Sequence, residues 1–118
     1  MSVSAYKKTI KETESPKSIE KRIFSRITGQ LEKLEDTPDN VLKPEYKDAL
    51  WENQKLWMAL RADLVLPENS LPPQLKAQLI SLGIWVDNHT QKILRGQAKI
   101  QDLISVNRNI IAGLEGKN

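Results

Sequence analysis

The sequence of 118 residues contains no cysteine and a single histidine. The absence of cysteine excludes disulfide bonds, thiol catalysis and thiolate metal sites. His89 alone cannot supply the imidazoles of a two-histidine metal site, so no metal site is predicted. We expect His89 to be a partly buried side chain that bonds to a neighbour.

Sequence patterns that carry catalysis are also missing. There is no glycine-rich phosphate loop, no nucleophile elbow, and no pair of carboxylates at helical spacing in an apolar setting. The acidic residues within 35–40 lack the alternating ligands and the glycine of a calcium loop, so we expect a solvated turn there. The sequence therefore predicts a protein that is not an enzyme and binds no cofactor.

Long apolar runs are lacking as well. No N-terminal run suits a signal peptide and no stretch could span a bilayer, so we expect a cytoplasmic protein with no membrane contact. The 18 basic and 15 acidic residues give a net charge of only +3. Basic residues are concentrated only in residues 1–26, with seven Lys and Arg against three Glu. This pattern favours a solvated helix face over a nucleic-acid site.

Strand signals are nearly absent, and helical periodicity recurs between prolines and glycines. Ser15-Pro16 is a strong helix start, because serine accepts a backbone N–H and proline at the first helical position loses no hydrogen bond. The periodicity predicts a short N-terminal helix and four main helices, over about 4–13, 16–34, 44–66, 72–95 and 98–113. We predict one all-α bundle over 1–118, with 1–14 loosely docked and 115–118 a disordered tail.

Residues 50–86 hold all three tryptophans, in two helical stretches around the proline-broken turn VLPENSLPP. Both stretches carry apolar side chains on two sides, which is more than a simple amphipathic helix needs. At 100° per residue, an inner stripe runs through Trp57 and Leu79. The candidate partner-binding residues form a second line nearly opposite: Trp51, Met58, Ala62, Val65, Ile80 and Ile84. This pattern fits burial under neighbouring helices and binding of a partner equally well.

Three further residues interrupt the apolar stripes. Asn53 and Asn107 lie inside them, where an unpaired polar group costs about 1–3 kcal/mol. Each asparagine should therefore bond to a loop backbone, to the other asparagine or to a partner helix, and the first two, structural, alternatives are favoured. Gly83 in mid-helix costs roughly 1 kcal/mol against alanine, which indicates close packing or a bend.

Several short stretches occur together in one known family. They are residues 50–57 (LWENQKLW), 63–64 (DL), 67–72 (PENSLP), 75–82 (LKAQLISL) and 103–114 (LISVNRNIIAGL), with Ala5-Tyr6 and Ser15-Pro16 near the N-terminus. In this order they resemble the flagellar regulator FlaF family, small proteins of flagellin biosynthesis, over nearly the whole chain. Two departures are small. Gln54-Lys55 stands where the family often has an arginine, and Trp85 where another aromatic residue is usual.

The resemblance implies a helical, cytoplasmic protein without enzymatic activity that is required for flagellin production and export. It offers two mechanisms. In one, the protein is an export chaperone that binds newly made flagellin, whose amphipathic terminal helices tend to self-assemble, and it promotes flagellin synthesis. In the other, it regulates flagellin messenger RNA after transcription, directly or through the partner regulator FlbT.

The residues themselves favour the chaperone mechanism. A chaperone that binds helices needs an apolar groove or patch, and the second apolar line is a candidate. RNA binding would require clustered arginines and exposed aromatic residues, whereas these tryptophans stand among Leu, Met and Val. We expect flagellin as the partner, a FlbT-like regulator as a further one, and no direct contact with nucleic acid. An adaptor that pairs only with FlbT or with itself is the third possibility, so the oligomeric state is open.

Overall fold

The computed structural model describes residues 16–34 and 43–114. The helix expected over 4–13, the loosely docked segment 1–14 and the tail 115–118 lie outside the described residues. Within them the chain forms four α-helices and no strand: α2 (Pro16–Glu32), α3 (Pro44–Leu64), α4 (Pro73–Leu94) and α5 (Gln101–Leu114). The predicted all-α fold with four main helices is confirmed.

The helix boundaries follow from local chemistry. Prolines occupy the first position of three helices, where their missing N–H loses no hydrogen bond: Pro16, Pro44 and Pro73. α4 ends before Gly96, which adopts a left-handed conformation with φ 73°. The N–H of Gly96 donates to the Ile93 carbonyl at 2.9 Å, and that of Gln97 donates to the Lys92 carbonyl at 2.8 Å. These two bonds form a Schellman cap, so the helix stop predicted at Gly96 is confirmed.

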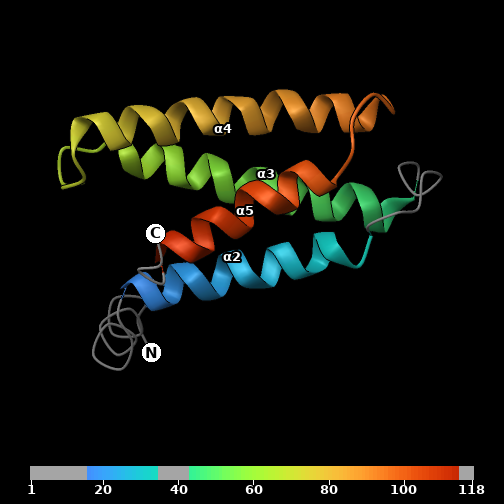
Figure 1. The fold of residues 1–118 in the computed structure, drawn as a ribbon, viewed down its shortest axis with the longest axis horizontal. Coiled ribbons are helices and arrows are strands. Elements are labelled where there is room, and N and C mark those ends of the chain that lie inside the picture. Colours follow the sequence, from blue (N-terminus) through green and yellow to red (C-terminus); the bar gives the residue numbers. More distant parts are fainter. Residues whose placement is uncertain (1–15, 35–42, 115–118) are drawn as a thin grey trace, which may run out of the picture.

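α3 and α4 form an antiparallel hairpin, and α2 packs against both α3 and α5 (Figure 1). α4 has few contacts with α5, which runs away from it after the connection between the two helices (Figure 1). The turn between α3 and α4 is held by Asn69, whose Nδ2 donates to Asp63 Oδ2 at 3.0 Å. Asn69 Oδ1 in turn accepts the backbone N–H of Leu71 at 3.1 Å.

The core lies around Trp57, which is fully buried. The Phe24 ring of α2 meets it edge-on, with ring centroids 5.9 Å apart. The inner stripe predicted for α3 is buried along most of its length. On α4 the buried residues begin only at Gly83 and are Gly83, Val86, Thr90 and Ile93. Leu79 is half-buried and Leu75 is exposed, because the part of the chain that the structure describes leaves the first half of α4 uncovered.

Candidate partner-binding surface on helices α3 and α4

The structure leaves the predicted partner-binding residues largely open to solvent. Trp51 and Ile84 are each 50% exposed, Met58 is 44% exposed and Val65 is 70% exposed. Ala62 is also exposed and Ile80 is half-buried. The six residues are called the α3–α4 surface below: Trp51, Met58, Ala62, Val65, Ile80 and Ile84. The neighbouring helices among the described residues therefore do not cover this second apolar line.

The six residues lie on one side of the hairpin. On α3, the four members fall within a sector of about 60° at helical spacing. Arg61 borders this sector and reaches α4, where its Nη2 donates to Asp87 Oδ2 at 2.7 Å. On α4, Ile80 and Ile84 lie on the same side of the helix as Asp87, next to its side chain around the helix. Two apolar lines, one from each helix, therefore flank the Arg61–Asp87 ion pair.

Gly83 makes the crossing of Arg61 over α4 possible. A Cβ atom added at Gly83 would lie 2.7 Å from Arg61 Cδ and 3.1 Å from its Cγ, so the side chain of Arg61 would have to shift. The close packing that Gly83 suggested is thus present, and its cause is the side chain of Arg61. The sequence reasoning missed the Arg61–Asp87 pair itself. Its only signal was a glycine four residues before an aspartate in α4.

Further exposed apolar residues were not among the predicted ones. They gather around the turn and along the uncovered side of α4: Leu66, Leu71, Leu75 and Trp85. Trp85 stacks on His89, with ring centroids 4.5 Å apart. These positions were missed because a side chain is exposed where the neighbouring helix ends, and helical periodicity does not show where that is.

His89 connects α4 with the start of α5. Its Nε2 lies 3.0 Å from the carbonyl oxygen of Lys99 and 3.2 Å from Asp102 Oδ2. The side chain is only partly accessible. The expectation of a partly buried histidine that bonds to a neighbour is confirmed, and its position is away from the α3–α4 surface.

Asn53 and Asn107 belong to the core. Both side chains are fully buried. Asn107 Nδ2 donates to Asn53 Oδ1 at 2.7 Å, and Trp57 Nε1 donates to Asn107 Oδ1 at 3.0 Å. Of the arrangements considered from the sequence, the structure has the one in which the asparagines bond to each other. Together with Trp57 they tie α3 to α5.

The described residues offer few groups for chemistry. Among them, no three His, Asp or Glu side chains come together as a metal site. Burial raises the pKa of the Tyr46 phenol, which faces the core. None of the helices in the described ranges has the length and apolar character needed to cross a membrane.

These features define the class of the molecule: a small all-α protein whose described residues form four helices, two of which make a hairpin with an exposed apolar surface. The model of the family described as flagellar protein FlaF matches residues 2–114, and the chain belongs to this family. Membership assigns the chain a role in flagellar biogenesis. No curated protein and no solved structure matches the chain.

Proposed function

We propose that the chain is a cytoplasmic export chaperone that binds flagellin and promotes its synthesis. The observation that carries this proposal is the exposed α3–α4 surface. Apolar side chains from two antiparallel helices, open on one side, suit an amphipathic helix that lays its own apolar face between them. In a family of flagellar proteins, the terminal helices of flagellin are partners of that chemistry.

The residues of the surface suit such a partner in size and spacing. Burial of a Met, Ile or Val side chain contributes roughly 1.5–3 kcal/mol, part of which offsets the cost of association. Ala62 presents only a methyl group between the larger Met58 and Val65, so the α3 line has a low point where a partner side chain fits. A bound flagellin helix would be kept from self-assembly. The fraction of chaperone that is occupied also depends on the flagellin concentration, so regulatory partners that distinguish the free from the bound chaperone would respond to that concentration.

Met58→Asp and Ile84→Asp test this proposal. Each places a carboxylate on the surface, so we expect co-purification with flagellin to fall below detection. Because both side chains are exposed, the circular dichroism spectrum and the melting temperature should stay close to those of the wild type. Leu94→Asp is the matched control, since Leu94 is an exposed apolar residue of α4 outside the surface. It should retain flagellin.

Four results would contradict the proposal. If Met58→Asp and Ile84→Asp retain flagellin, the binding surface lies elsewhere. If they unfold the domain, the two residues act as core. A gel shift with flagellin leader RNA is the third test, because tight binding that weakens steeply with salt would favour direct regulation of the messenger RNA. Capture of a FlbT-like protein without flagellin would instead indicate an adaptor.

A further inference from the structure

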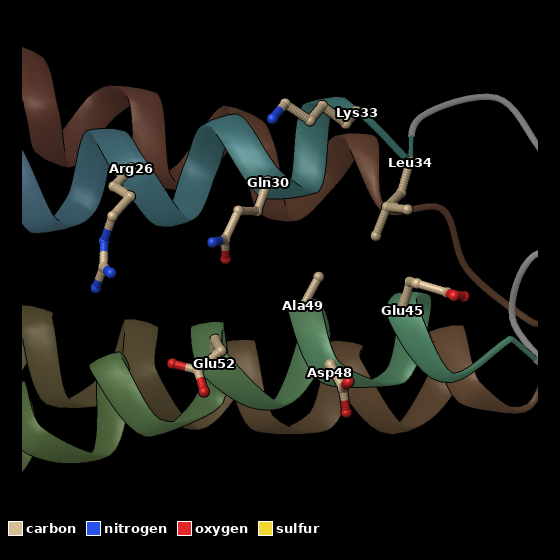
Figure 2. Close-up of a pocket in the computed structure, with 8 residues that line it drawn as sticks. All are labelled: Arg26, Gln30, Lys33, Leu34, Glu45, Asp48, Ala49 and Glu52. Atoms are coloured by element: carbon tan, nitrogen blue, oxygen red, sulfur yellow. The ribbon is translucent and has the colours of Figure 1, made fainter.

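A second surface feature lies on another flank of α3. An open groove of about 600 Å³ separates α2 from α3 (Figure 2). Its α2 wall carries Arg26, Gln30 and Lys33, and its α3 wall carries Glu45, Asp48 and Glu52. Leu34 and Ala49 complete the lining. We call this feature the α2–α3 groove.

Each wall of the groove carries charge of one sign. The α2 residues follow at spacings of four and three, and the α3 residues at spacings of three and four, so each set forms one line about 10 Å long. The two helices are antiparallel. Along the groove, Glu52 therefore lies between the levels of Arg26 and Gln30, Asp48 lies level with Lys33 just after the end of α2, and Glu45 lies level with Leu34 (Figure 2).

The charges of the two walls do not pair across the groove. Among the ion pairs of the described residues, none involves Arg26, Lys33, Glu45 or Asp48. Glu52 pairs with Lys55 of its own helix at 2.8 Å, and both side chains are exposed. A basic line and an acidic line thus lie side by side, and Arg26, Lys33, Glu45 and Asp48 have no ion-pair partner among the described residues.

We propose that the α2–α3 groove is the contact between two copies of this chain. A symmetric dimer brings the same surface of both copies together, so the surface must be complementary to itself. A basic line beside an acidic line meets this requirement under one rotation, a two-fold axis that runs along the groove parallel to α2 and α3. This rotation places the basic line of one copy over the acidic line of the other.

The same rotation also keeps each residue at its own level along the axis. Glu52 of one copy then lies opposite the stretch from Arg26 to Gln30 of the other, and Asp48 lies opposite Lys33. A two-fold axis across the groove would instead place basic on basic and acidic on acidic. An axis perpendicular to the groove would not bring the two faces together. The distribution of charge therefore selects one geometry.

The dimer contact adjoins the proposed flagellin site without including it. On α3 the acidic line lies roughly 100° around the helix from Met58. The two surfaces meet at Lys55, whose Nζ pairs with Glu52 and lies 5.8 Å from the centroid of the Trp51 ring. Because exposed ion pairs individually contribute little and are screened by salt, we expect association that is weak and falls as the salt concentration rises.

Sedimentation equilibrium of the full chain tests the proposal with two variants of opposite charge. One is Arg26→Glu with Lys33→Glu, and the other is Glu45→Lys with Asp48→Lys. Each variant alone has two lines of like charge, so we expect each to be monomeric under conditions in which the wild type dimerises. Mixed in equal amounts they should form a heterodimer, because the acidic lines of one face the basic lines of the other.

Lys92→Glu with Lys99→Glu is the matched control, since it makes the same change of charge at exposed positions outside the groove and should leave the dimer intact. The neutral variant Arg26→Gln with Lys33→Gln should weaken association in the same direction as the charge reversal. A wild type that stays monomeric at low salt would overturn the proposal. So would a mixture of reversed variants that fails to associate, or a dimer that survives both reversals but is lost in Met58→Asp.

Discussion

Asn107 makes two side-chain hydrogen bonds that join α5 to α3. Its amide oxygen accepts from Trp57 and its amide nitrogen donates to Asn53, and all three side chains are fully buried. Apolar side chains of two helices can pack in several registers, whereas a hydrogen bond between two buried amide groups forms in only one register. The network therefore fixes how far α5 is shifted along α3.

Asn107→Ala should destabilise the fold more than Asn53→Ala. The first substitution leaves Trp57 Nε1 and Asn53 Oδ1 without their partner, whereas the second orphans only Asn107 Nδ2. At about 1–3 kcal/mol for each buried orphaned group, urea denaturation should separate the two variants clearly. The double variant should cost less than the sum of the single ones, because they share one bond.

Asn88→Ala is the control for this series, because Asn88 is exposed on α4 and its loss should change the free energy of unfolding by less than about 0.5 kcal/mol. Equal costs for Asn53→Ala and Asn107→Ala, or costs that simply add, would contradict the assigned network. The sequence alone showed that both asparagines need partners. It could not show that they find each other across 54 positions, because that depends on how the two helices are aligned.

At the scale of the element, α4 divides at Gly83. Before this residue α4 has no buried position, and from it onward the helix packs on α3 through the glycine and the side chains that follow. Glycine is an unfavourable residue in a helix interior. Here its small size lets the side chain of Arg61 pass over α4 and bond to Asp87.

Gly83→Ala should therefore have opposite effects in two backgrounds. In the wild type, the new methyl group displaces Arg61 and weakens its bond to Asp87, so the usual gain in helix propensity should be lost or reversed. In an Arg61→Ala background the space is free, and the same substitution should stabilise the fold by about 1 kcal/mol. Denaturant unfolding of the four proteins in this cycle measures the difference.

Gly29→Ala provides a control within the same molecule. Gly29 is also helical, and no atom lies within 4 Å of a Cβ added there. Its replacement should stabilise the fold by up to about 1 kcal/mol, with or without Arg61. A full gain from Gly83→Ala in the wild type would show that Arg61 moves aside without cost.

At the scale of the whole molecule, the hairpin of α3 and α4 extends beyond the core. Residues 73–82 contain no buried side chain, whereas α5 is buried along its apolar stripe. Local opening of a segment requires less free energy when few apolar contacts are broken. The stability of the fold should therefore be uneven, with its low end at the hairpin turn.

Native-state hydrogen exchange should show this difference. We expect the amides of residues 75–82 to exchange through local opening, at free energies below that of global unfolding. The amides of 103–111 should exchange near the global value. Occupation of the α3–α4 surface by flagellin should slow exchange in the first segment and leave the second unchanged. Uniform protection along α4 would contradict this view of the hairpin.

Much of the fold could be predicted because it depends on local rules. Proline at helix starts, the glycine stop at Gly96 and apolar spacing gave the four helices with boundaries close to those observed. Which side of a two-sided helix is covered depends on the lengths and positions of its neighbours. For that reason the sequence left Met58 and Ile84 undecided, placed the half-buried Leu79 on the inner stripe, and gave no indication of the charged groove.

The pairing of α2 with α5 has a consequence for how the protein is made. The apolar stripe of α2, with Phe24, Ile27 and Leu31, finds much of its cover on a helix that follows it by some 70 residues. Until residues 101–114 have been added, that stripe can meet only α3, through contacts such as Phe24 with Trp57. Completion of the core must therefore wait until α5 has left the ribosome. The α3–α4 hairpin needs only its own two arms, so it can assemble earlier.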